Sequence, residues 1–145
     1  MTAERRRPLA ARVGVFGVGH DRYWSQFEGL RDELEGKLRR FIAKVESTGV
    51  DVVPFGIVDS ARSAAALLPR LQAADLDLVF VDMLTYATSA SFAAIARALP
   101  VPIVLVALQP SSAMDYPRSS TFIQLCNDDI CSLPEFAGVA LRLGR

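Results

Sequence analysis

The chain has 145 residues, of which 51% are hydrophobic and 22% charged, a balance typical of a globular protein rather than a disordered one. Sixteen basic and sixteen acidic residues cancel, so the chain offers no net positive field to a phosphate backbone, and we expect no nucleic-acid partner. No stretch supplies the roughly 20 apolar residues of a membrane helix. Two cysteines are too few for a disulfide scaffold, so a reducing, cytoplasmic location without membrane contact is expected.

Residues 1–11 include three consecutive arginines ahead of Pro8, and we expect them to form a disordered, solvated basic tail. The tail lacks the apolar run of a signal peptide. The remaining residues, 12–145, are expected to form one domain, which is long enough to bury a hydrophobic core.

The apolar run Val13–Phe16 predicts the first strand. Ser25, with Glu28 three residues further on, has the pattern of a capping box, so a long helix is predicted to start there, with Asp21 as an earlier candidate cap. Apolar residues then recur at helical spacing, at Phe27, Leu30, Leu34, Leu38, Phe41, Ile42 and Val45. Gly49 is expected to end this helix, because glycine tolerates the left-handed conformation past a helix C-terminus.

Apolar runs predict three further strands, at Val50–Val53 with an extension through Ile57, at Leu76–Val81 and at Val101–Ala107. Ser60 is expected to cap a second helix, which Pro69 should kink or shorten. A third helix is predicted near Ser89–Leu99. Ser132 with Glu135 forms a second capping-box pattern, which predicts a last helix near the end of the chain.

Strands and helices thus alternate along the chain, which predicts a parallel sheet with right-handed crossovers and helices on both faces. We expect an α/β fold, a flavodoxin-like three-layer α/β/α sandwich with strand order 2-1-3-4 and the fifth strand absent. The chain ends just after a predicted helix, where this topology normally enters its next strand. We therefore expect a longer parent protein with further C-terminal domains.

Ligands of such a sheet bind outside the carboxyl ends of its strands. Four loops emerge there, at residues 17–24, 55–60, 82–89 and 108–120, and they hold the only histidine, the only tryptophan and all three tyrosines. Ring faces beside hydrogen-bonding groups suit a polyhydroxylated ligand, since rings cover C–H patches while polar groups bind hydroxyls. The candidate substrate-binding residues are His20, Tyr23, Trp24, Tyr86 and Gln109.

Other motifs in these loops are incomplete. Gly17 and Gly19 fit the start of a dinucleotide fingerprint, but Arg22 stands where its third glycine is needed. Cys126 and Cys131, even with the distant histidine, lack a fourth ligand for zinc. Nor is a third group indicated that would activate a cysteine–histidine nucleophile pair.

Asp82 ends the third predicted strand, in the position where response-regulator receivers carry their phosphorylated aspartate. Receivers also resemble this chain in length and topology. They need an acidic pair after the first strand to hold magnesium, and here only Asp21 stands nearby. A stand-alone receiver-like signalling module, or another small-molecule-binding module, is the alternative to the interpretation that follows.

Four stretches, in order and spacing, resemble the N-terminal part of the L-fucose/L-arabinose isomerase-like sugar isomerases. They are Gly17-Val-Gly-His-Asp-Arg-Tyr-Trp-Ser-Gln-Phe27, Asp82-Met-Leu-Thr-Tyr-Ala-Thr-Ser89, Val104-Leu-Val-Ala-Leu-Gln-Pro110 with Met114-Asp-Tyr116, and Cys126 to Phe136. Together they cover nearly the whole chain after the tail.

The resemblance implies that this is the flavodoxin-like N-terminal domain of a metal-dependent aldose–ketose isomerase. The catalytic metal of that family, usually Mn²⁺, and its acid/base carboxylates belong to later domains, so the resemblance implies no catalytic or metal-binding residue here. It also implies packing at subunit interfaces of a homo-oligomer and a role in binding the sugar substrate. By position, the turn around His20, Tyr23 and Trp24 and the region of Gln109 correspond to residues that face the substrate.

Overall fold

The computed structural model describes residues 10–145, so the predicted basic tail lies almost entirely outside the described residues. The strands are β1 (Arg12–Val18), β2 (Asp51–Val58), β3 (Leu78–Met83) and β4 (Ile103–Val106). The α-helices are α1 (Leu30–Glu46), α2 (Ala61–Ala73), α3 (Ala93–Ala98), α4 (Thr121–Cys126) and α5 (Leu133–Arg142). Short 3₁₀ turns are η1 (Asp21–Tyr23), η2 (Ser89–Ser91) and η3 (Tyr116–Arg118).

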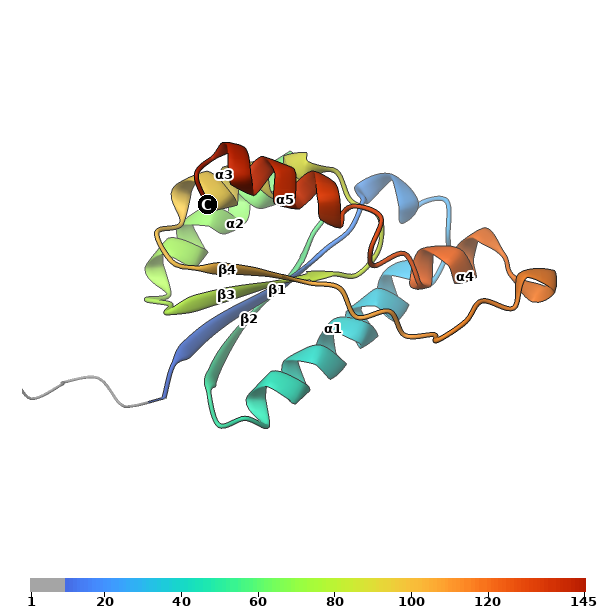
Figure 1. The fold of residues 1–145 in the computed structure, drawn as a ribbon, viewed down its shortest axis with the longest axis horizontal. Coiled ribbons are helices and arrows are strands. Elements are labelled where there is room, and N and C mark those ends of the chain that lie inside the picture. The colour runs from blue at the N-terminus through green and yellow to red at the C-terminus, as the bar shows by residue number, and fades with distance from the viewer. Residues whose placement is uncertain (1–9) are drawn as a thin grey trace, which may run out of the picture.

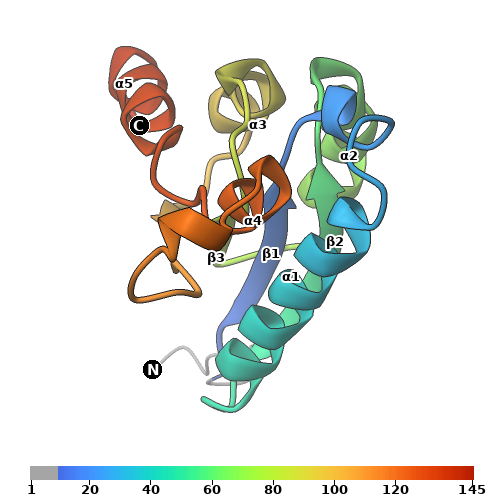
Figure 2. The ribbon, with the colours of Figure 1, turned by 90° about the vertical axis from the view of Figure 1, so that its right-hand side faces the viewer.

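The four strands form one parallel sheet in the order β2-β1-β3-β4, as predicted (Figure 1). The register places Gly17 of β1 beside Asp82 of β3, and Asp82 beside Val106 of β4. Helices α2, α3 and α5 cover one face of the sheet and α1 covers the other (Figures 1 and 2). The fold is therefore a flavodoxin-like three-layer α/β/α sandwich.

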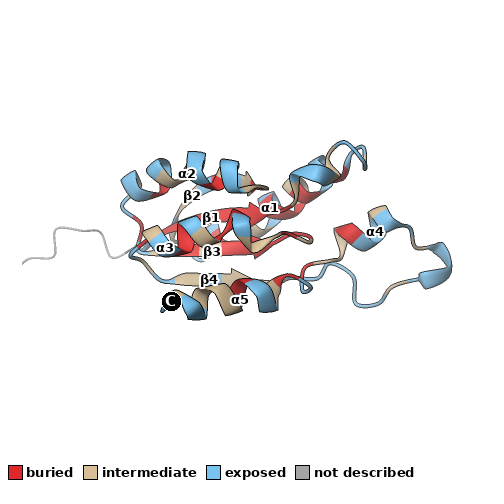
Figure 3. Ribbon diagram, turned by 90° about the horizontal axis from the view of Figure 1, so that it is seen from above, coloured by how far each residue is buried: buried red, intermediate tan, exposed pale blue. Residues whose placement is uncertain are grey.

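The core lies on both sides of β1 and β3, which are the most buried strands (Figure 3). On one side, Phe16, Val81 and Met83 pack with side chains from α2, α3 and α5, including the stacked rings of Phe92 and Phe136. On the other side, strand residues pack against the apolar face of α1. Burial of these apolar side chains is the main force that holds the helices to the sheet.

The first helix does not begin at Ser25. The 3₁₀ turn η1 comes first, closed by the Tyr23 N–H donating to the His20 carbonyl at 3.0 Å. Helix α1 begins at Leu30, after Gly29, which has a left-handed conformation with φ 79° and provides no side-chain cap. Because Gly29 redirects the chain, Ser25 precedes the helix by too many residues to cap it.

Other boundaries differ from the predictions in identifiable ways. Strand β2 extends through the predicted optional part to Val58, and α2 continues through Pro69 to Ala73 without ending there. The region predicted as the third helix is split into η2 and the short α3. Helix α4 lies just beyond the predicted polar loop 109–120 and was not predicted at all. Within residues 10–145, none of the helices has the length and apolarity needed to cross a bilayer.

The caps predicted at Ser60 and Ser132 have opposite outcomes, and neither of the two predicted capping boxes, Ser25 with Glu28 and Ser132 with Glu135, forms. Ser60 caps α2, accepting a hydrogen bond from the Ser63 N–H at 3.2 Å. Ser132 makes no side-chain cap for α5. Its hydroxyl oxygen instead accepts from the Ala87 N–H at 2.9 Å, and Glu135 accepts from the Ser89 N–H at 2.8 Å. These two side chains therefore fasten the loop after β3 to α5.

Candidate functional site

The carboxyl ends of all four strands point to the same end of the molecule, which faces the viewer in Figure 2. The segment with η1, the loop after β3, the long loop after β4 and α4 gather around that end (Figures 1 and 2). This is the edge at which ligands bind in open parallel sheets. All five predicted substrate-binding residues belong to these loops.

Three rings from two of these loops lie together. The ring centroids of His20 and Tyr23 are 5.2 Å apart, those of His20 and Tyr86 are 6.0 Å apart, and those of Tyr23 and Tyr86 are 6.4 Å apart. The His20 Nδ1 atom lies 3.1 Å from a carboxylate oxygen of Asp21. We call His20, Tyr23 and Tyr86 the ring cluster. Residues 66 positions apart thus form one surface because β1 and β3 are neighbouring strands.

The pKa of Tyr23 is affected by residues that are distant in the sequence. Partial burial raises the pKa of its phenol, and Tyr86, Asp128 and Cys131 raise it further. Asp128 follows α4, so the ring cluster lies beside the α4 region. The Tyr23 hydroxyl therefore remains a neutral hydrogen-bond donor and acceptor at physiological pH.

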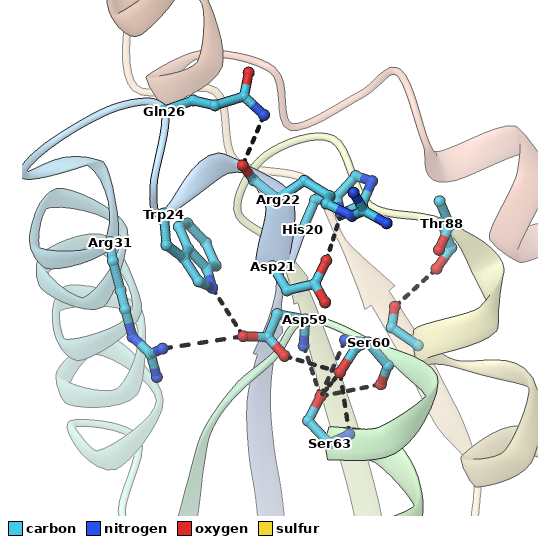
Figure 4. A network of polar contacts seen from close by, with 11 residues as sticks. His20, Asp21, Arg22, Trp24, Gln26, Arg31, Asp59, Ser60, Ser63 and Thr88 are labelled. Atoms are coloured by element: carbon cyan, nitrogen blue, oxygen red, sulfur yellow. Dashed lines mark hydrogen bonds and ion pairs between the residues drawn. The ribbon is translucent and has the colours of Figure 1, made fainter.

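Trp24 follows Tyr23 of the ring cluster in the chain, but its side chain contacts the turn after β2 instead. Its indole Nε1–H donates to Asp59 Oδ2 at 2.8 Å, and the Arg31 guanidinium lies 5.7 Å from the indole ring (Figure 4). A Cβ atom on Gly19 would come within 2.9 Å of this indole, so a glycine there makes room for the ring. Trp24 therefore braces the β1 turn against the β2 turn.

Asp59 is the centre of that network. Burial opposes its ionisation, but hydrogen bonds with Trp24, Ser63 and Ser60 outweigh burial and hold the pKa of the carboxyl below its usual value. An ionised, hydrogen-bonded Asp59 gives the turn a fixed geometry. The network (Figure 4) therefore positions the ring cluster rather than leaving it on a mobile loop.

Gln109 does not join the ring cluster in any contact recorded for residues 10–145. It lines a polar hollow of about 570 Å³ between the loop after β4 and α4. The other residues around this polar hollow are Met114, Tyr116, Ser119, Ser120, Thr121, Gln124, Asn127 and Asp128. Because Asp128 also influences Tyr23, the polar hollow and the ring cluster are neighbouring parts of one edge.

A buried lysine lies behind this edge. Lys37 of α1 donates to the carbonyl oxygens of Leu84 at 2.9 Å and Cys126 at 2.9 Å, and to Asp129 Oδ1 at 2.7 Å. These three bonds use all the donors of the ammonium group. Lys37 therefore ties the loop after β3 and the end of α4 to α1.

Sequence reasoning missed Lys37, although a signal was present. The residue stands between Leu34 and Leu38 in the apolar face of the helix, where a lysine needs a buried partner. Its partner Asp129 lies 92 positions away. No pattern in the sequence identified that partner, because no helix was predicted at residues 121–126, where α4 packs beside α1.

Asp82, at the end of β3, is 3% exposed and lies near Lys37 without pairing with it. Burial raises its pKa to about 7, with the charge of Lys37 lowering it and that of Asp129 raising it. A carboxyl group that takes up a proton near neutral pH can both donate and accept hydrogen bonds.

The two cysteines are free thiols. Burial raises the pKa of Cys126, and burial together with the Asp128 side chain raises that of Cys131 to about 11. Both groups are therefore protonated thiols at neutral pH, which makes them poor nucleophiles and poor metal ligands.

Among residues 10–145, His, Cys, Asp and Glu side chains do not come together in a group of three or more that would hold an ion. The side chains at this edge offer rings, hydroxyls, amides and carboxyl groups to a ligand.

Fold and edge together define a flavodoxin-like α/β domain whose loops present clustered rings beside a polar hollow. No family model matches the chain, and no curated protein matches it either.

Proposed function

We propose that the chain is the substrate-binding and oligomerisation domain of a metal-dependent aldose–ketose isomerase of the L-fucose/L-arabinose isomerase-like kind. The observation that carries this proposal is the juxtaposition of the ring cluster with a polar hollow at the ligand edge of the sheet. The resemblance in sequence supplies the reaction class.

The chemistry of the edge suits a sugar. The rings of His20, Tyr23 and Tyr86 offer flat faces for the C–H patches of a sugar. The polar hollow beside them offers amide, hydroxyl and carboxylate groups, which satisfy sugar hydroxyls in both directions. In this proposal Gln109 contacts the substrate from the polar hollow, and Trp24 positions the turn that carries two of the rings.

In this proposal the domain binds substrate and the catalytic steps belong elsewhere. Mn²⁺ or a similar ion, and the carboxylates that move a proton between sugar carbons, would come from the C-terminal domains of the parent or from a neighbouring subunit. The 145-residue chain supplied with an aldose and Mn²⁺ is accordingly expected to show no isomerisation.

The proposal is tested by titrating the isotope-labelled chain with L-fucose and L-arabinose and following backbone amide shifts. We expect weak, saturable binding with shifts at Tyr23, Tyr86 and Gln109. Tyr86→Ala should weaken it by roughly fivefold, about 1 kcal/mol for a lost ring contact. The control is Leu141→Ala, a change at an exposed side chain of α5. Absence of shifts at this edge with both sugars would contradict the proposal.

The alternative is a receiver-like or small-molecule-sensing module, and in a receiver Asp82 would accept a phosphoryl group. A phosphate-accepting aspartate must be ionised, whereas burial raises the pKa of this one to about 7. This observation counts against the receiver. Labelling of Asp82 by acetyl phosphate would favour the receiver, and tight sugar binding by the isolated monomer would favour a sensor.

A further inference from the structure

A second hollow, separate from the ring cluster, opens on the α1 side of the sheet. It measures about 300 Å³, near the lower end of the range for small-molecule sites. One wall comes from α1, where Lys37, Arg40, Phe41 and Lys44 share a face because they stand three or four residues apart. The opposite wall is residues 108–110 after β4, and Asp82 lies at the end of β3 between them. We call it the Asp82 hollow.

The Asp82 carboxyl lines this hollow and has no partner in the described part of the chain. The Asp82 residue is 3% exposed, yet its carboxyl makes no hydrogen bond or ion pair with any of residues 10–145. The nearby ammonium of Lys37 is already used by three other oxygens. Among these residues the fully buried side-chain atoms without a partner are Thr85 Oγ1 and Asp129 Oδ2, so the Asp82 oxygens keep some contact with solvent. Because Asp82 lines the hollow, a molecule bound there would meet its carboxyl.

Cationic groups stand at the opening of the same hollow. The Arg40 side chain is 66% exposed, and its Nη2 atom forms an ion pair with Glu33 Oε1 at 3.7 Å. Lys44 is also exposed. Phe41 lines the same hollow, and its ring makes an edge contact with Phe80, with 5.8 Å between the ring centroids. The Asp82 hollow thus has a carboxyl at its inner end, one apolar wall and positive charge at its mouth.

We propose that the Asp82 hollow binds a small hydroxylated anion, with a hydroxyl on the Asp82 carboxyl and a phosphate or carboxylate between Arg40 and Lys44. The inner carboxyl accepts a hydrogen bond from the hydroxyl or donates one to it, which supplies the partner that it lacks. The outer cations bind the anionic group through charge-assisted hydrogen bonds. The site lies apart from the ring cluster and does not depend on the sugar-isomerase proposal.

Three molecules of one skeleton test this proposal: glycerol phosphate, glycerate and glycerol. Each is titrated into the isotope-labelled 145-residue chain, with inorganic phosphate as a fourth probe. We expect saturable amide shifts at Phe41, Asp82 and Leu108 with one or both hydroxylated anions, while the ring cluster does not move. Comparison of the two anions distinguishes phosphate from carboxylate.

Two variants and a matched control locate the contacts. Asp82→Asn keeps the shape of the hollow but removes the ionisable carboxyl, and the double variant Arg40→Gln/Lys44→Gln removes the outer charges. Each should weaken binding at least roughly tenfold. Arg39→Gln changes an exposed arginine of α1 that does not line the hollow, and should bind like the unmodified chain.

The proposal fails if neither hydroxylated anion produces saturable shifts at the Asp82 hollow. It also fails if inorganic phosphate binds as well as glycerol phosphate and Asp82→Asn has no effect, since the site would then hold an adventitious ion only. Shifts at His20, Tyr23 and Tyr86 alone would overturn it too, while leaving the sugar-binding proposal intact.

Discussion

Two aspartates at the carboxyl ends of β2 and β3, the strands on either side of β1, have opposite environments. Asp59, after β2, accepts hydrogen bonds from Trp24 and Ser60, and its interactions with these residues and with Ser63 keep its pKa low. Asp82, at the end of β3, is more deeply buried and has no such bonds, and its pKa rises to about 7. Asp59 thus stabilises a turn as a carboxylate, whereas Asp82 is buried without hydrogen bonds to its carboxyl. The difference arises because hydrogen bonds offset the free-energy cost of burying a carboxylate.

The raised pKa of Asp82 predicts a specific pH dependence of stability. An unfolded Asp82 loses its proton near its ordinary value of 3.8, whereas the folded group holds it up to about pH 7. Its contribution to folding is therefore fully present below the lower pKa and is lost as the pH rises to the upper one. Between about pH 5 and about pH 8, the unmodified chain should lose roughly 2–3 kcal/mol relative to Asp82→Asn.

Urea unfolding of both proteins at the two pH values measures this difference. Other ionisable groups are common to both chains, so their contributions largely cancel in the comparison. Equal pH dependence of the two free energies of unfolding would show that Asp82 titrates at its ordinary pKa in the folded protein.

At the level of single residues, the sequence located the ring cluster but not the buried charges. His20, Tyr23 and Tyr86 follow adjacent strands, and parallel topology alone brings such residues together. Lys37 and Asp129 meet only because α4 packs beside α1, and Gln109 faces the two hollows for the same kind of reason. Contacts set by irregular loops follow no periodic pattern, so the sequence did not predict them.

Among the helices, one serine cap is real and another only matches the pattern. Ser60 accepts from the Ser63 N–H, whereas Ser25 lies exposed ahead of Gly29 and α1. We therefore expect Ser60→Ala to lower the free energy of unfolding by about 1 kcal/mol and Ser25→Ala to change it by less than about 0.5 kcal/mol. Denaturant unfolding of the two variants checks this, and a larger loss in Ser25→Ala would place a cap where the structure has none.

Ser132 and Glu135 illustrate why capping patterns are ambiguous. Both side chains accept hydrogen bonds from backbone groups of the loop after β3, at Ala87 and Ser89, instead of from α5 itself. The hydrogen bond to Ser89 holds the pKa of Glu135 below its usual value. A serine and a glutamate at this spacing satisfy whichever buried N–H groups lie nearest, and a local pattern does not reveal which those are.

For the molecule as a whole, alternation of strands and helices was enough to predict the sheet order. Right-handed crossovers and strands buried on both faces leave few arrangements for such a chain. The predicted order 2-1-3-4 is confirmed, although several boundaries moved. Burial of apolar side chains specifies the layers, whereas turns such as the one at Gly29 depend on backbone conformations that composition does not determine.

The sheet order also predicts how stability is distributed. Strands β1 and β3 are each paired on both sides, whereas β4 pairs only with β3 within residues 10–145. Hydrogen exchange should therefore be slowest in β1 and β3, and markedly faster at the β4 amides that point away from β3. Exchange measured by mass spectrometry or NMR tests this order. Protection of those β4 amides equal to that of β1 would mean that something covers them in solution.

The outer side of β4 leaves the sheet extensible. Val104 of this strand is 41% exposed, and the backbone groups on that side are available to pair with another strand. In a further strand paired in parallel with β4, the loop at its carboxyl end would lie near Gln109 and the Asp82 hollow. Whatever supplied that segment would thereby gain a position from which to enlarge or close the binding surface without disturbing the packed interior.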